Sequence, residues 1–254
     1  FQGIFKNPLV SPDILGVSYG AGFGAALAIL LTNGGVYLQA SAICFGMLAV
    51  FAAYTMARFF KGAPVLVLVL SGIIVGAFFQ ALLSSLKYIA DPYDKLPSII
   101  FWLMGSLSRV SAGDLSWTLP AFAAGMGALY LCRWRINLLA LGDEEARALG
   151  VNTTLERGAV IFVCTLLSCL AVCLAGTISW VGLVIPHVGR LLVGSDYRRL
   201  LPACISLGGI YLILIDNAAR ALTMNEIPLG ILTSLIGAPF FAMLLMRRRA
   251  GWRG

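Results

Sequence analysis

Long apolar runs separated by short polar segments dominate this chain. A helix needs about 20 apolar residues, at about 1.5 Å each, to cross about 30 Å of hydrocarbon. The strict alternation of apolar and polar residues that is typical of barrel strands is rare here. The pattern therefore predicts an all-α polytopic transmembrane bundle with about eight spans, at residues 14–31, 36–57, 64–86, 117–132, 158–176, 178–193, 200–222 and 227–246.

One further apolar stretch, at residues 96–107, is too short to cross a bilayer. It indicates an interfacial or re-entrant helix, with Trp102 near the lipid headgroups, because tryptophan is enriched at that depth. The spans at 117–132 and 178–193 are also short.

Composition supports a membrane protein. Hydrophobic residues make up 60% of the 254 residues and charged residues only 11%, whereas soluble domains carry about 25% charge. This excludes an ordinary soluble enzyme, a disordered chain and a secreted disulfide scaffold.

The basic residues divide unequally between the two sides of the predicted bundle. An even number of spans places both ends of the chain on one side, and that side carries 13 of the 18 Lys and Arg residues. The other side carries three, Lys87, Lys95 and Arg109. The positive-inside rule makes the basic side cytoplasmic, with both termini inside. The same rule explains the net charge of +7 without a nucleic-acid partner.

No set of residues predicts catalysis, a cofactor or a metal site. His187 is the single histidine, and the six cysteines have no CxxC spacing. No G-x-x-x-x-G-K-[ST] loop occurs, so the chain has no P-loop for a nucleotide. If ATP drives this protein, the ATPase is another polypeptide.

One carboxylate interrupts the apolar spans. Asp216 follows four aliphatic residues, and an intramembrane carboxylate costs about 2.5–3.5 kcal/mol on insertion scales. Arg220 lies four residues on, which is the spacing of a same-face pair on a helix. The sequence predicts that the two neutralise each other near the outer end of the span, and leaves open whether Arg220 also faces an external acidic partner.

The largest predicted cytoplasmic loop, residues 133–157, carries the signals of a short helix. Asp143 is the expected N-cap, acidic residues follow in the first turn, and Gly150 is the expected C-terminal stop. Leu141, Ala146 and Leu149 give the segment an apolar side. A helix of two turns is unstable alone in water, so it must dock on its own bundle or in a groove on a partner.

Four stretches resemble one known family. Residues 140–150 are similar to the cytoplasmic coupling segment of FecCD-type permeases, the membrane subunits of type II ABC importers for iron-siderophore, haem and cobalamin. Residues 2–18, 175–190 and 226–240 resemble other family stretches, in the same order along the chain. Family members have ten helices, so the resemblance implies that the first helix and most of the second are missing from this sequence.

The resemblance implies a BtuC-like permease domain over residues 1–254 in a bacterial or archaeal inner membrane. Two copies would form the pathway, two cytoplasmic ATPases would grip the coupling segment, and a periplasmic or lipoprotein binding protein would deliver the ligand at Arg220. The implied ATPase-coupling residues are Leu141, Gly142, Asp143, Glu144, Ala146, Arg147, Leu149 and Gly150.

Family frequency favours an iron-siderophore as the substrate, and leaves haem and cobalamin open. A chelator already satisfies its metal, so the absence of His, Cys and Glu clusters fits a chelate better than a bare ion. The alternatives from other classes are a stand-alone secondary transporter, which would need buried ionisable residues on several spans, and a membrane scaffold, which would not need a docking loop.

Overall fold

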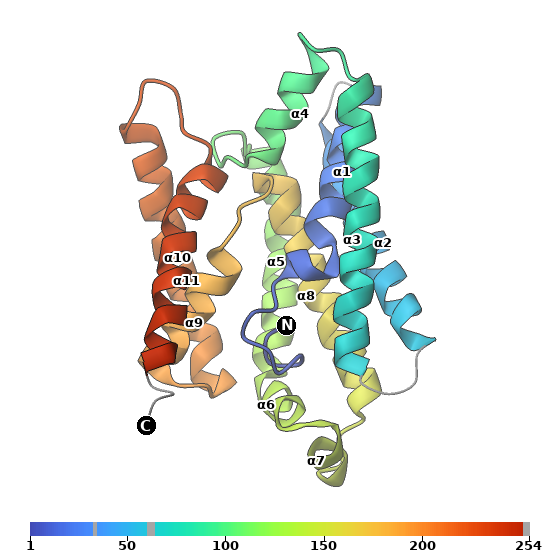
Figure 1. Cartoon of the computed structure of the whole chain (residues 1–254), viewed down its shortest axis with the longest axis vertical. Helices are drawn as coiled ribbons and strands as arrows, with labels where there is room; N and C mark the ends of the chain where they lie inside the picture. The colour runs from blue at the N-terminus through green and yellow to red at the C-terminus, as the bar shows by residue number, and fades with distance from the viewer. Residues whose placement is uncertain (33–34, 60–63, 251–254) are drawn as a thin grey trace.

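The computed structural model describes residues 1–32, 35–59 and 64–250, and within these ranges every regular element is a helix (Figure 1). Two of the basic positions counted above, Lys61 and Arg253, lie outside the described residues. The predicted all-α polytopic bundle is confirmed. The helices are η1 (Pro12–Leu15), α1 (Val17–Leu31), α2 (Val36–Arg58), α3 (Pro64–Ile89), α4 (Lys95–Leu103), α5 (Ala112–Leu131), α6 (Arg133–Leu141), α7 (Asp143–Ala148), α8 (Thr153–Ala175), α9 (Val181–Val193), α10 (Tyr197–Ala221) and α11 (Leu229–Ala250).

The predicted spans differ in length. Four helices are long and apolar enough to cross a membrane by themselves: α2, most of α3, α8 and α10. A fifth candidate is α5 together with α6, which are bent by 56° at the break between them. The apolar stretches of α1, α9 and α11 are shorter. The described chain therefore has four or five full-length candidates and three shorter apolar helices at the positions of the eight predicted spans.

Glycines let the first helices approach closely. A Cβ atom placed on Gly20 of α1 would lie 2.5 Å from the Phe45 carbonyl oxygen of α2 and 2.8 Å from the Ala49 Cβ. Such small-residue contacts are how helices pack where lipid removes the hydrophobic driving force. The aromatic rings of Phe23, Phe45 and Phe79 fill the space where α1, α2 and α3 meet.

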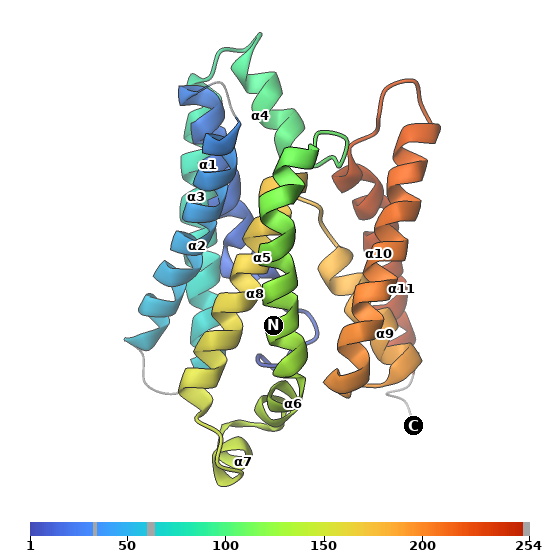
Figure 2. The same cartoon turned by 180° about the vertical axis from the view of Figure 1, so that it is seen from behind.

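The helices form two groups that lie side by side (Figure 1). The group α1, α2, α3, α5 and α8 is joined to the group α9, α10 and α11 partly through contacts of α10 with α6. The view from behind shows the same division, with α5 and α8 in one group and α10 in the other (Figure 2). The turn from α3 to α4 lies at one end of the first group, and α6 and α7 lie at its other end.

Main-chain hydrogen bonds tie three distant segments together where α4 ends. The Ser106 amide donates to the Ala175 carbonyl at 2.9 Å, and the Leu229 amide donates to the Gly105 carbonyl at 2.9 Å. Gly105 and Gly176 both have positive φ, at 77° and 70°, and both are packed against backbone, so a side chain would fit at neither. The ends of α4 and α8 and the start of α11 are therefore held at one point.

The stretch at 96–107 forms the short helix α4, and the Trp102 side chain packs inside the bundle. Its side chain is only 8% exposed and packs with Ala21, Ala25 and Cys173. Tertiary packing against α1 and α8, which no local pattern reveals, covers the indole, and the depth of Trp102 relative to the headgroups stays a prediction.

Candidate functional site

The predicted coupling segment, residues 133–157, contains two short helices, α6 and α7, joined at one glycine. Gly142 has φ 146° and ψ 169°, so it breaks the chain between α6 and α7. At the other end of α7, the Gly150 amide donates to the Arg147 carbonyl at 2.9 Å and the Val151 amide to the Ala146 carbonyl at 3.0 Å. With Gly150 at φ 81°, this is a Schellman motif. The local sequence signal for the end of this helix therefore has a direct structural basis.

The start of α7 differs from the expectation. Gly142, not Asp143, occupies the N-cap position, and no side chain caps this helix. Asp143 is the first helical residue, and its carboxylate instead accepts two hydrogen bonds from the Arg157 guanidinium of α8, one of them at 3.1 Å. The capping expectation was wrong because this non-local, two-pronged ion pair is available to the carboxylate.

The Asp143–Arg157 pair fixes α7 to the start of α8. The two side chains are 30% and 14% exposed, so the pair is shielded from solvent on one side. The hydrogen bonds from Arg157 hold the pKa of Asp143 below its ordinary value, while partial burial acts in the opposite direction. Asp143 is therefore ionised throughout the neutral range.

The three apolar residues of the coupling segment divide between two environments. Ala146 is fully buried and belongs to the same core cluster as Ile4, Phe5 and Leu139. Leu141 and Leu149 are 54% and 59% exposed. The segment thus docks on its own bundle through Ala146 and presents two leucines outward.

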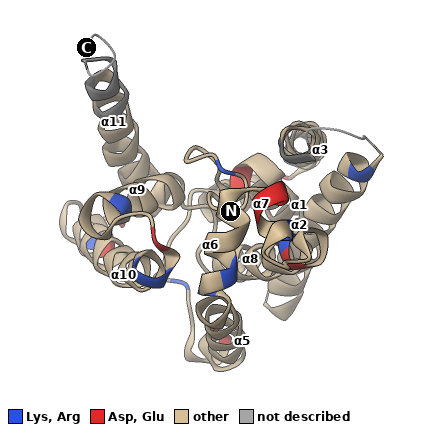
Figure 3. Ribbon diagram, turned by 90° about the horizontal axis from the view of Figure 1, so that it is seen from below, with Lys and Arg blue, Asp and Glu red and all other residues tan. Residues whose placement is uncertain are grey.

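The outward side of α7 is also charged. Glu144, Glu145 and Arg147 are exposed. Figure 3 looks onto this end of the molecule, where the acidic positions of α7 appear in red. The Lys6 ammonium donates to the Leu141 carbonyl and so ties the N-terminal segment to the end of α6. The result is a surface of two exposed leucines beside charged groups.

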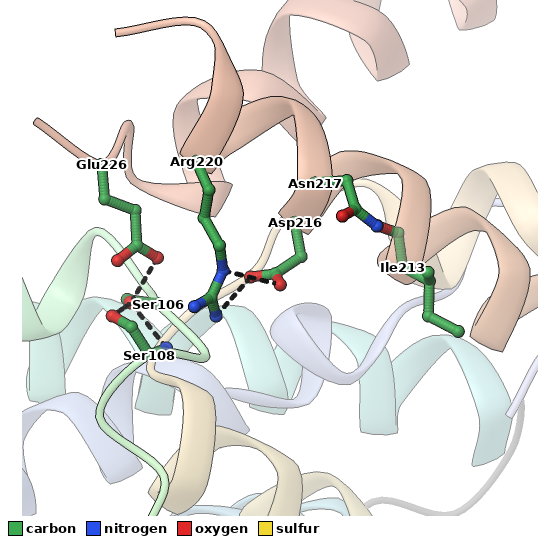
Figure 4. Close-up of polar contacts among 7 residues, drawn as sticks. All are labelled: Ser106, Ser108, Ile213, Asp216, Asn217, Arg220 and Glu226. Atoms are coloured by element: carbon green, nitrogen blue, oxygen red, sulfur yellow. Dashed lines mark hydrogen bonds and ion pairs between the residues drawn. The ribbon is translucent and has the colours of Figure 1, made fainter. Parts of the chain in front are cut away.

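Asp216 and Arg220 meet at the opposite end of the molecule (Figure 4). The Arg220 guanidinium donates from Nε to one carboxylate oxygen of Asp216 at 2.9 Å, and from a terminal nitrogen to the other at 3.1 Å. The Asp216 side chain is 22% exposed and that of Arg220 is 49% exposed. Half of Arg220 therefore stays accessible although its charge is paired.

A second carboxylate lies beside this pair. Ser106, in the loop after α4, donates to Glu226 at 3.0 Å and exchanges a hydrogen bond with Ser108 at 2.7 Å. Figure 4 shows Glu226, in the loop after α10, beside Arg220 in the last turn of that helix. This cluster joins the loop after α10 to the loop after α4.

His187 lies in α9 with its ring near those of Phe240 and Phe241 on α11, at 6.5 Å and 6.3 Å between centroids. Among the described residues, no group of three or more His, Cys, Asp and Glu side chains is placed to hold a metal ion. The described side chains therefore present no metal centre of their own.

Sequence reasoning missed a polar cavity of about 340 Å³ between α1, α3, α4 and the loop before α9. Asp13, which accepts a hydrogen bond from Ser18, lines it together with side chains of α3 and of that loop. The available signal was polar residues at spacings of four and three, which share one helix face, within the otherwise apolar α3. The polar side chains on these two elements are Gln80, Ser84, Lys87, Thr177 and Ser179.

The comparisons with known proteins agree on one family. The family model described as the FecCD transport family matches residues 1–247. The chain is 43% identical over 250 residues to the "Molybdate import system permease protein MolB" of Haemophilus influenzae, covering 98% of this chain and 74% of that protein. It is also 43% identical over 249 residues to a "Probable iron chelatin transport system permease protein" of Helicobacter pylori, covering 98% of this chain and 75% of that one.

A cobalamin permease is also similar. The "Cobalamin import system permease protein BtuC" of Halobacterium salinarum is 38% identical over 248 residues, covering 97% of this chain and 66% of that protein. A solved structure of a protein described as a metal-chelate type ABC transporter, in an inward-facing conformation, superposes with a TM-score of 0.90 at 44% identity. That match covers 97% of this chain and 79% of the other.

Proposed function

Because the chain belongs to the FecCD transport family of ABC importer permeases, we propose that it carries an iron chelate of the siderophore type across the inner membrane, driven by ATP that a separate subunit hydrolyses. We propose that residues 1–254 form one transmembrane permease domain, with its coupling segment at 133–157.

The observation that carries the ATP-driven mechanism is the outward surface of α6 and α7. Leu141 and Leu149 are more than half exposed at an end of the molecule where the helices carry basic residues, whereas Ala146 already secures the segment to its own bundle. Exposed leucines beside charged groups are suited to a protein partner, because burying apolar area drives association. In this proposal Gly142, Asp143 and Gly150 hold the leucines in place, and Glu144 and Arg147 are the charged contacts of the ATPase.

At the opposite end, the accessible half of Arg220 supports docking of a substrate-binding protein. A guanidinium binds a carboxylate in a two-pronged geometry, and Asp216 holds this one in a defined position. We propose a homodimer of permeases with two ATPase subunits on the cytoplasmic side and a binding protein outside, with both ends of this chain cytoplasmic.

The cargo proposal rests on chemistry and on the relatives together. A chelate brings its own metal ligands, and the described side chains form no metal cluster. Two of the similar relatives are named for iron chelatin, one for molybdate and others for cobalamin. Molybdate, cobalamin and haem are therefore the competing cargoes that a test must include.

Uptake into proteoliposomes tests both the cargo and the dependence of transport on a separate ATPase. The permease is reconstituted with its ATPase and its binding protein, and uptake of a ferric siderophore, molybdate, cobalamin and haem is measured with ATP or with a non-hydrolysable analogue inside. We expect ATP-dependent uptake of the ferric siderophore alone. ATP-dependent uptake of another cargo would refute the siderophore assignment, and uptake without the ATPase would indicate a stand-alone transporter.

A further inference from the structure

A basic cavity of about 220 Å³ lies where α2, α7 and α8 come together. Arg58 from the last turn of α2, Arg147 of α7 and Arg157 of α8 line it, with Asp143 as its carboxylate. Phe5, Leu68 and Tyr54 supply apolar walls. Three guanidinium groups thus converge on one cavity from three separate helices.

The cavity carries surplus positive charge. Arg157 is paired with Asp143, so these two groups neutralise each other. Arg147 donates from Nε to the Thr153 hydroxyl at 3.2 Å, which is a neutral partner. Within the part of the chain that the structure describes, neither Arg58 nor Arg147 has a carboxylate at ion-pair distance. The cavity is therefore suited to an anion that can accept hydrogen bonds from two guanidinium groups.

An apolar groove of about 470 Å³ begins where the basic cavity ends. It lies between α2 and α8, and Tyr54 lines both the groove and the cavity. Leu48, Phe51 and Phe162 line the groove and are 46%, 64% and 56% exposed. Apart from Tyr54 and Thr165, every residue that lines the groove is apolar.

The length of the groove matches the hydrocarbon thickness of one leaflet of a bilayer. It follows α2 from Cys44 to Tyr54, which lies ten residues further along the helix. At about 1.5 Å per residue this is about 15 Å, half of the hydrocarbon thickness of about 30 Å. Tyrosine is enriched at the interface between hydrocarbon and headgroups, which is where Tyr54 lies in this arrangement.

From this juxtaposition we propose that the cavity and groove together form a binding site for one anionic phospholipid. The headgroup phosphate lies between Arg58 and Arg147, and an acyl chain follows the groove between α2 and α8. Because Arg147 belongs to α7, the bound phosphate links the lipid to the coupling segment. A free phosphate would occupy only the cavity. A zwitterionic lipid would bind more weakly than an anionic one, because the two arginines attract its headgroup less.

The test compares lipids on the purified full chain, so it depends neither on the orientation in the membrane nor on the ATPase. Native mass spectrometry measures the binding of phosphatidylglycerol and phosphatidylcholine with matched acyl chains. We expect phosphatidylglycerol to bind more tightly, and Arg58→Gln to weaken its binding about fivefold, the effect of one basic residue near an anionic lipid surface. Arg58→Lys keeps the charge and should retain most of the binding.

Two further variants separate the parts of the site. Arg199→Gln removes another exposed arginine, one that does not line the cavity, and should leave lipid binding unchanged. Gly158→Leu places a side chain in the groove, where an added Cβ would meet only the Tyr54 hydroxyl at 3.7 Å. This variant should weaken the binding of both lipids. Equal losses for Arg58→Gln and Arg199→Gln would overturn the proposal, and so would competition by glycerol 3-phosphate at the same concentration as the whole lipid.

Discussion

The two exposed leucines of the coupling segment provide the most direct test of ATPase docking. Fully burying a leucine side chain contributes about 1.5–3 kcal/mol. Leu149 is 59% exposed and Leu141 is 54% exposed, so just over half of that contribution is still available to a partner. Truncating either leucine to alanine should therefore cost about 1–2 kcal/mol of association free energy, which weakens the affinity for the ATPase about 5- to 30-fold.

The assay is the binding of purified ATPase to the permease in nanodiscs, followed by interferometry for Leu149→Ala, Leu141→Ala and the wild type. Leu31→Ala is the matched control, because Leu31 is 72% exposed but lies at the far end of α1. The control should bind like the wild type. Leu149→Asp should abolish ATP-driven uptake, because it buries a carboxylate without a partner in the docked complex.

The buried member of the segment should behave differently. Ala146 has no exposed surface, so Ala146→Leu overpacks the permease itself and should lower its melting temperature before any effect on the ATPase is seen. If both leucine variants bind the ATPase within about twofold of the wild type and also support normal uptake, the leucines are not the docking surface and the reasoning fails.

On a background without exposed native cysteines, Asp94→Cys should react with an impermeant maleimide added outside cells and Arg199→Cys should not; the opposite result would reverse the proposed topology. Arg220→Glu should weaken delivery from the binding protein, measured as uptake at limiting binding protein, while basal ATPase activity persists. Full restoration of uptake by Asp216→Asn combined with Arg220→Ala would show that Arg220 only neutralises its partner. Asp143→Asn should destabilise the permease by roughly 1–2 kcal/mol in thermal unfolding at pH 7. Because hydrogen bonds from arginine lower the pKa of Asp143, this difference should persist as pH falls to about 4 and vanish only below the ordinary pKa of 3.8; a loss between pH 8 and 5 would contradict it.

The local sequence pattern was sufficient to predict the all-helical class and the features that lie within a single helix. Apolar run length predicts helices because a lipid-facing backbone must satisfy its own hydrogen bonds, whatever the tertiary structure. The spacing of Asp216 and Arg220 places both on one face of α10, and their two-pronged contact needs no other element. Gly150 ends α7 because only a residue that tolerates positive φ completes the Schellman motif there.

Contacts between distant segments were decided by the tertiary structure alone. The sequence grouped Leu141, Ala146 and Leu149 on one apolar side, yet packing against the N-terminal segment and α8 buries only Ala146. Asp143 had the local signature of an N-cap, but Arg157, fourteen residues away, supplies a stronger partner. Pairings of this kind depend on how helices pack, which periodicity within a single helix does not encode. The same reason explains why the basic cavity, built from arginines on three helices, could be located only once those helices were placed together.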